Sequence, residues 1–263
     1  MRCPRRCRWK SPVRSHVIPK PLLQCVYQRA GQADNIRRWF GGLTALIEPL
    51  AVGWHAVKIS PFAPAQPAHG NRPSTVLVLG GGPIGLAVIQ ALKAKAKAAS
   101  SSSSSSSSPE APENKQTIIV SEIATSRQRF ARHFGASHII NPLQEDLVAR
   151  TKEINGGVGV DLVFDCAGVQ SALDQAVECL KPRGTLVNIA VWEQKAQLEV
   201  GHFLFRERKY MGVATYQEGD YMEVLTAIEG GEFVPLFYPI SFALLFVLLR
   251  REGRLMLMMM MYR

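Results

Sequence analysis

The sequence predicts an α/β fold, a doubly wound six-stranded parallel sheet. From residue 75 onward, short runs rich in β-branched residues alternate with stretches of helical periodicity, which is the pattern of a parallel sheet covered by helices. The first run leads directly into Gly80-x-Gly82-x-x-Gly85, a motif that is informative where it follows a strand and begins a helix. Six such runs with crossover helices are the full complement of a dinucleotide-binding (Rossmann) fold.

The elements are expected in a simple order along the chain. A helix should cover 48–58, because Glu48 and Pro49 begin an apolar stretch with helical spacing and proline suits a first helical turn. The proline-rich segment 60–74 should then be a loop. The expected strands are 75–79, 117–121, 137–140, 160–165, 185–190 and 210–214. The expected helices are 83–97, 125–134, 144–154, 170–180 and 220–229.

The composition divides the chain into three parts. Residues 1–42 are rich in Arg, Pro and Trp without periodicity, and we expect an unstructured basic segment. Residues 43–232 should form the dinucleotide-binding domain, with a serine-rich insertion at about 95–116. In the atypical hydrophobic tail, 233–263, prolines leave only about ten continuous, almost entirely apolar residues, fewer than the roughly 20 that a membrane helix needs. We expect a tail foreign to the fold, such as the end of a mis-spliced or frame-shifted product, with a buried helix and a membrane contact as the alternatives.

The net charge of +10 is confined to the two ends of the chain. Residues 1–40 carry ten Lys and Arg against one acid, and residues 250–263 carry four against one. The remaining 17 bases and 19 acids lie between residues 41 and 249. The folded part therefore has no basic surface to follow a phosphate backbone, and we expect no nucleic-acid partner.

Cysteine usage and the first residues bear on the compartment. The five cysteines are odd in number and scattered, which favours a reducing compartment over a disulfide framework. The N-terminal residues lack the apolar region of a secretory signal. Residues 1–33 are Arg-rich and acid-free like a mitochondrial transit peptide, but their prolines would break the amphipathic helix of such a peptide. We expect a cytoplasmic protein without a membrane partner, with mitochondrial import as the alternative.

The glycine motif predicts a pyrophosphate site. Gly80 permits a tight turn, Gly82 lets the backbone approach the phosphates, and Gly85 lets helix and strand pack closely. Pro83 and Ile84 complete the loop, where the free N–H groups of a helix start face the ligand. The alternative is a glycine-rich turn without a ligand.

The acid that binds the adenosine ribose in such folds is expected at Glu122, which ends the strand 117–121. Glu122 lies 37 residues after Gly85, against a usual spacing of about 20, and the serine-rich insertion accounts for most of the surplus. We expect the insertion to form a disordered excursion on the far edge of the sheet, at a closure cost of about 1 to 1.5 kcal/mol. A carboxylate favours NAD over NADP; Arg127 could soften this preference but is expected on the solvated face of its helix.

Two later strand ends are expected to line the crevice for the nicotinamide half. Ala167 and Gly168 follow one of these strands, and Ile189 and Ala190 follow the other. Beside them, Asp165 is expected to organise its loop, and Cys166 to be a small buried residue, because no histidine or acid is arranged to activate its thiol. No catalytic residue is assigned.

Several segments in order, among them "ALIEPLAVGWHAVK", "VLVLGGGPIGLAVIQALKA", "VDLVFDCAGVQSALDQA" and "FRERKYMGVATYQEGDY", resemble the coenzyme domain of the zinc-containing medium-chain alcohol dehydrogenases. The likeness covers about residues 45 to 232 and is greatest to the butanediol and sorbitol (polyol) dehydrogenases. It implies an NAD-dependent oxidoreductase that transfers hydride from a secondary alcohol with the help of a catalytic zinc. It also implies that Gly80, Gly82 and Gly85 bind pyrophosphate, that Glu122 binds ribose, and that Glu48 lies near the zinc.

The sequence departs from this family in its zinc ligands. The chain contains no Gly-His-Glu motif and no four-cysteine lobe, and residues 1–42 do not resemble the family's GroES-like catalytic domain. A catalytic zinc needs three protein ligands, and Glu48 alone cannot supply them. We therefore expect a truncated, catalytically impaired form that binds NAD(H) without binding zinc.

Two other functions are considered. The chain could be a non-catalytic fragment that pairs with itself or with a full-length dehydrogenase through the sheet edge near 209–216, as the dimers of the family do. It could instead be an S-adenosylmethionine-dependent methyltransferase, which also uses a glycine-rich first loop and an acid after the second strand. A short-chain dehydrogenase is excluded, because no tyrosine is followed by lysine four residues later.

Overall fold

The computed structural model describes residues 40–64, 74–102 and 116–233. Nearly all of these belong to one compact unit, Thr44–Leu236; a second unit, Met1–Leu43 with Phe237–Arg263, lies almost entirely outside them. Most of the expected basic segment, the centre of the serine-rich insertion and the expected tail beyond Phe233 therefore lie outside the described residues.

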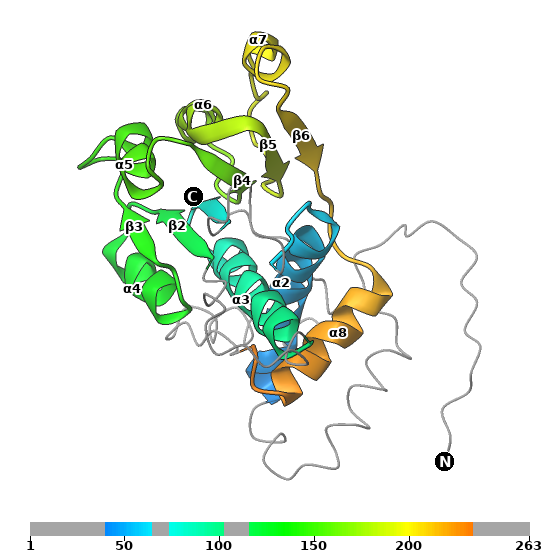
Figure 1. The fold of residues 1–263 in the computed structure, drawn as a ribbon. Helices are drawn as coiled ribbons and strands as arrows, with labels where there is room; N and C mark the ends of the chain where they lie inside the picture. Colours follow the sequence, from blue (N-terminus) through cyan, green and yellow to red (C-terminus); the bar gives the residue numbers. More distant parts are fainter. Residues whose placement is uncertain (1–39, 65–73, 103–115, 234–263) are drawn as a thin grey trace, which may run out of the picture. The chain divides into compact units, whose positions relative to one another are not determined.

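Six parallel strands form one sheet in the order β3-β2-β1-β4-β5-β6 (Figure 1). The chain order reverses between β1 and β4, which is the arrangement of a Rossmann fold and confirms the predicted fold class. The strands are β1 (Thr75–Leu79), β2 (Thr117–Ser121), β3 (His138–Ile140), β4 (Val160–Asp165), β5 (Leu180–Asn188) and β6 (Lys209–Gly212).

The last paired residues of the strands form one row across the sheet. Leu79 is in register with Ser121 on one side and with Asp165 on the other. Asp165 is in register with Asn188, and Asn188 with Gly212. Because all the strands are parallel, this row marks the carboxyl edge, and the loops that follow it begin side by side.

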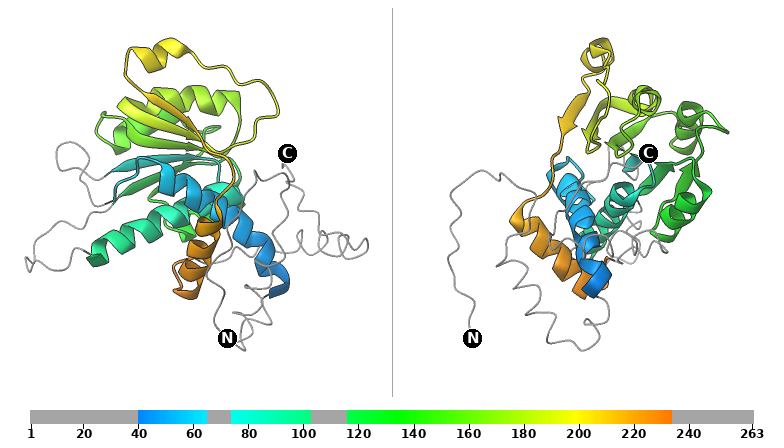
Figure 2. Two further views of the ribbon diagram at one scale, coloured as in Figure 1. Left: turned by 90° about the vertical axis from the view of Figure 1, so that its right-hand side faces the viewer. Right: turned by 180° about the vertical axis from the view of Figure 1, so that it is seen from behind.

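Helices cover both faces of the sheet (Figure 2). One face carries α3 (Pro83–Ser102) and α4 (Thr125–His133), and the other carries α5 (Leu147–Ile154) and α6 (Gln170–Cys179). Between the sheet and the second pair lies a core of buried residues that includes Leu77, Leu79, Val163, Leu173, Ala176 and Leu186. Burial of these side chains fixes which residues face each layer.

The first helix begins earlier than predicted. α2 spans Phe40–Ile59, so Pro49 lies inside the helix instead of in its first turn, and residues 40–42 are helical. Proline removes one backbone N–H from the helix. The helix continues past it because Ile47, Leu50 and Ala51 are almost fully buried on either side.

The predicted bounds of three other elements, α3, α5 and β5, are wrong by three residues or more. α3 continues to Ser102, so the first serines of the tract extend the helix. α5 begins only at Leu147, because the Asp146 side chain accepts the N–H groups of Val148 and Ala149 and caps the helix there. β5 begins five residues early and ends at Asn188. The short helix α7 (Val200–Leu204) was not predicted; its residues are not buried, so no apolar periodicity marks it.

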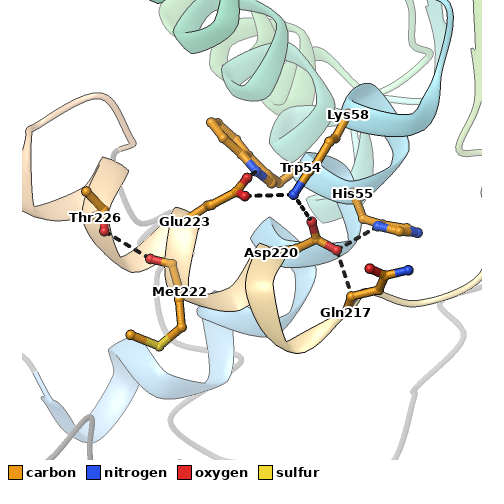
Figure 3. Close-up of polar contacts among 8 residues, drawn as sticks. All are labelled: Trp54, His55, Lys58, Gln217, Asp220, Met222, Glu223 and Thr226. Atoms are coloured by element: carbon orange, nitrogen blue, oxygen red, sulfur yellow. Dashed lines mark hydrogen bonds and ion pairs between the residues drawn. The ribbon is translucent and has the colours of Figure 1, made fainter. Parts of the chain in front are cut away.

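A polar network joins α2 to the last described helix, α8 (Glu218–Glu229) (Figure 3). The Asp220 carboxylate lies 2.6 Å from Nδ1 of His55 and accepts a hydrogen bond of 3.0 Å from Nζ of Lys58. Glu223 accepts from the same Lys58 and from the indole N–H of Trp54. The network fixes the end of the described chain to its beginning.

Candidate functional site

The glycine motif forms the connection from β1 to α3. Gly80 has φ +87°, and its N–H donates to the carbonyl of Ser121 at 2.8 Å, which ties the loop to β2. α3 begins at Pro83, where a missing N–H costs no helical hydrogen bond. The loop thus presents a helix N-terminus at the carboxyl edge of the sheet, an arrangement that binds anions.

Two glycines of the motif differ in the reason they are needed. A Cβ at Gly85 would lie 1.9 Å from the carbonyl oxygen of Gly80, so only glycine lets the helix pack this closely. A Cβ at Gly82 would meet no atom within 4 Å. The space beside Gly82 is therefore open for a ligand, and Ile84 follows it in the first turn of α3.

Glu122 lies next to this loop and is 4 % exposed. One carboxylate oxygen accepts the N–H of Gly81 at 2.7 Å, and the other accepts the N–H of Ala124 at 2.8 Å. The acid at the end of β2 is thus held against the middle of the glycine motif. The bond to Gly81 was not predicted. The signal in the sequence was Gly81 itself, the middle one of three consecutive glycines, because a Cβ there would lie 3.2 Å from the Glu122 side chain.

Arg127 faces Glu122 more closely than the sequence suggested. Its Nη1 lies 3.9 Å from a carboxylate oxygen of Glu122, and its side chain is 39 % exposed. The sequence predicts a position on the solvated face of the helix, and the structure gives a partly exposed side chain that also faces Glu122.

The loops after β4 and β5 are joined through Asp165, which is fully buried. Its Oδ1 accepts the N–H groups of Ala167 and Gly168, both at 3.0 Å. Its backbone carbonyl accepts the N–H groups of Ile189 and Ala190, also at 3.0 Å. This shared carbonyl takes residues 189 and 190 out of the regular ladder, which is why β5 ends at Asn188. Burial raises the pKa of Asp165, although the N–H groups of Gly168 and Ala167 oppose the shift.

Cys166, the next residue after Asp165, has a free thiol and is partly exposed, whereas the sequence predicted a small buried residue. Desolvation, with a smaller contribution from Asp165, raises its pKa well above the ordinary value. A thiol in this state is a poor nucleophile, which agrees with the sequence-based interpretation.

A model of the zinc-binding dehydrogenase family matches residues 114–230. These residues belong to that family. The match begins just before β2, after the glycine motif, and ends with α8.

Similar proteins agree with the family model. An (R,R)-butanediol dehydrogenase of Neisseria gonorrhoeae is 32 % identical over 190 residues, which cover 72 % of this chain and 46 % of that protein. The crystal structure of a 2R,3R-butanediol dehydrogenase from Bacillus subtilis superposes with a TM-score of 0.57 at 31 % identity, over 72 % of this chain and 46 % of the other. A zinc-binding dehydrogenase of Sinorhizobium meliloti bound to NADP gives a TM-score of 0.54 at 27 % identity, over 72 % and 48 %. The chain thus spans less than half the length of each of these three relatives.

The resemblance to the zinc-containing dehydrogenases implies that Glu48 of this chain lies near the metal. Here it lies half-buried on α2, close to two tyrosines. The pKa of Tyr216 is raised mainly by burial and secondly by the charge of Glu48. The pKa of Tyr221 is also raised mainly by burial, with smaller contributions from Tyr216 and Glu48. In the described ranges, no three His, Cys, Asp or Glu side chains gather closely enough to hold a metal ion. The described residues therefore do not supply the three ligands that a catalytic zinc needs.

No helix within the described part of the chain combines the length and the apolar character that crossing a membrane requires.

Proposed function

We propose that the chain binds a nicotinamide dinucleotide at the carboxyl edge of its sheet, as the coenzyme-binding part of an alcohol or polyol dehydrogenase. The pyrophosphate would lie over Gly80, Gly82 and Pro83 at the start of α3, and the nicotinamide half over the loops after β4 and β5. A reaction of this class transfers hydride between a secondary alcohol and the nicotinamide. Butanediol and sorbitol are the alcohols to test first. The free thiols of Cys166 and Cys179 support a reducing compartment, and we infer the cytoplasm.

The observation that carries this proposal is the contact between Glu122 and Gly81. It brings the ribose acid and the phosphate loop within one hydrogen bond, 2.7 Å, although the two residues lie 41 positions apart. A glycine-rich turn without a ligand gives no reason for a buried carboxylate at this place. The arrangement matches the fingerprint of a dinucleotide site, in which the acid follows the second strand.

We propose NAD rather than NADP as the cofactor. The carboxylate of Glu122 can accept hydrogen bonds from the 2′-hydroxyl of NAD and repels a 2′-phosphate. Arg127 opposes this preference from 3.9 Å, but its charge is shared with Glu122. The sequence contains no Gly-His-Glu motif, and we therefore propose dinucleotide binding as the chain's own activity, with alcohol oxidation measured separately.

Ligand-dependent thermal unfolding tests the proposal. The purified chain is heated with NADH, NADPH or S-adenosylmethionine. A ligand at 100 times its Kd should add about 2.7 kcal/mol of stability, a rise of about 5 to 10 °C for a unit of this size. Stabilisation by NADH above that by NADPH supports the proposal. Stabilisation by S-adenosylmethionine alone, or a transition that no ligand moves, contradicts it. Oxidation of butanediol and sorbitol with NAD⁺ is a second arm.

A second candidate function is pairing with another copy or with a full-length dehydrogenase through β6. β6 is an edge strand of the sheet, and three of its four residues are exposed. The N–H of Val213 donates to Asn188 of β5, so the N–H groups of Tyr210 and Gly212 point away from the sheet. Gly212→Pro should abolish pairing measured by light scattering and leave NADH binding intact. A dimer that survives this change contradicts the β6 interface.

A further inference from the structure

A single buried carboxylate holds the two loops at the nicotinamide end of the candidate site. Asp165 Oδ1 accepts from the backbone of Ala167 and Gly168, and the Asp165 carbonyl accepts from Ile189 and Ala190. One residue therefore touches all four positions that the sequence assigned to the nicotinamide half. Its side chain is fully buried, so it holds these four residues from the interior of the protein.

The two loops also pack against each other. Gly168 has φ +65°, and a Cβ there would lie 3.2 Å from the Cβ of Ala190. On the other side, Asn188 donates to the carbonyl of Ala190 at 3.2 Å and accepts the indole N–H of Trp192 at 3.0 Å. The loops after β4 and β5 are therefore packed together, and a shift in one displaces the other.

Asp165 lies at the point where the sheet reverses its chain order. It is in register with Leu79, the residue before the phosphate loop, and the N–H of Cys166 donates to the Leu79 carbonyl at 3.1 Å. Ligands of doubly wound sheets bind in the crevice at this switch point. The loops that Asp165 holds thus form the wall opposite the glycine motif.

We propose that Asp165 is a positioning residue that fixes both loops in advance for the nicotinamide half of the cofactor without touching it. This inference rests on the proposed function. The adenosine half binds at the glycine motif and Glu122, on the other side of the switch point. Loss of Asp165 should therefore affect the two halves of the cofactor unequally.

Calorimetric titration with NADH and with ADP-ribose, which lacks the nicotinamide ring, tests the inference. In Asp165→Ala the Kd for NADH should rise at least tenfold, and the Kd for ADP-ribose should stay within twofold of the original. Asp165→Asn keeps an acceptor oxygen for the loop and should restore NADH binding to within about threefold. Asp174→Ala, on the exposed face of α6, is the matched control and should change neither Kd.

The outcomes separate the inference from the proposed function. An unaltered chain that binds neither ligand refutes the proposed function and the inference with it. If the unaltered chain binds both ligands, the inference alone is overturned by an Asp165→Ala variant whose affinities for NADH and ADP-ribose fall equally or do not fall. It is also overturned if Asp165→Asn binds NADH as weakly as Asp165→Ala. If Asp165→Ala does not unfold cooperatively, Gly168→Ala takes its place as the test variant, because it disturbs the same contact while Asp165 stays intact. It should show the same selective loss of NADH, and unchanged NADH binding in it would overturn the inference.

Discussion

Replacing Asp220 by alanine should destabilise the fold strongly, because this carboxylate closes the junction between α2 and α8. It is 1 % exposed. It has three polar partners: His55 Nδ1 at 2.6 Å, Lys58 Nζ at 3.0 Å and the N–H of Gln217 at 2.8 Å. The last contact is half of a capping box that begins α8. Truncation would remove the Asp220 half of this capping box and leave the buried His55 ring without its Asp220 partner, while Lys58 would keep only Glu223.

The magnitude follows from these contacts. Removing one partner of a buried ion pair costs about 3 to 5 kcal/mol, and losing one contact of a capping box costs up to about 1 kcal/mol. The lower end applies here, since Lys58 is 39 % exposed and keeps Glu223 as a second partner. We expect a loss of about 3 kcal/mol, which corresponds to a fall in Tm of about 6 to 12 °C for a unit of this size.

Urea and thermal unfolding followed by circular dichroism measure this loss. Glu223→Ala is the internal control: it removes the half-exposed carboxylate of the same network and should cost no more than about 1 kcal/mol. A loss below about 1 kcal/mol for Asp220→Ala, or equal losses for the two variants, would refute the reasoning. The junction would then be held by apolar packing alone.

Four further outcomes are expected. Burial alone would raise the pKa of Asp220, but the Gln217 N–H, Lys58 and His55 together lower it below 3.8. The stabilising contribution of the carboxylate is therefore present above that pH and lost as the pH falls through the folded-state pKa. In urea titrations at acid pH, the unfolding free energies of the original chain and of Asp220→Asn should therefore converge. Gly85→Ala should abolish cooperative unfolding or cost several kcal/mol because of the 1.9 Å clash, whereas Gly82→Ala should change Tm by no more than about 2 °C and weaken NADH binding at least tenfold in calorimetry. Glu122→Gln places an amide against two backbone donors, so it should cost about 1 to 3 kcal/mol in urea unfolding and shift the ratio of the NADPH and NADH affinities toward NADPH; an unchanged ratio would exclude Glu122 from the ribose site. Replacing the serines at 103–108 by a single Gly-Ser pair should leave the Kd for NADH within twofold, and a larger change would place that segment near the ligand.

The sheet and its carboxyl-edge loops could be predicted because strands and glycines act locally. Four apolar residues in a row after Thr75 and a following Gly-x-Gly specify a buried strand and its turn without reference to the rest of the chain. Pro49 shows where local reasoning fails: proline favours a first helical turn, but burial of Ile47 and Leu50 on both sides outweighs the one missing hydrogen bond. The start of α2 is therefore set by burial in the folded protein, and no local sequence pattern indicates it.

The candidate site was predicted in its positions more than in its contacts. The sequence assigned Glu122, Gly168 and Ala190 to a ligand, yet it did not show that Glu122 is fixed by Gly81 or that Arg127 turns toward it. These contacts depend on which strands pair. Nor does any pattern join Asp220 to His55, which lies 165 residues away and whose α2 meets α8 only in the folded chain.

The long gap between the glycine motif and Glu122 shows why sequence spacing is a weaker criterion than strand register. The usual spacing of about 20 residues reflects a short helix between two adjacent strands. Here α3 has 20 residues and is about 30 Å long, and the chain re-enters the sheet where Thr117 pairs with Thr75, the first residue of β1. From that point, register alone brings Ser121 beside Leu79, and so Glu122 beside Gly81. The register after Thr117 therefore fixes the relation between the acid and the phosphate loop, whatever the number of residues between α3 and β2.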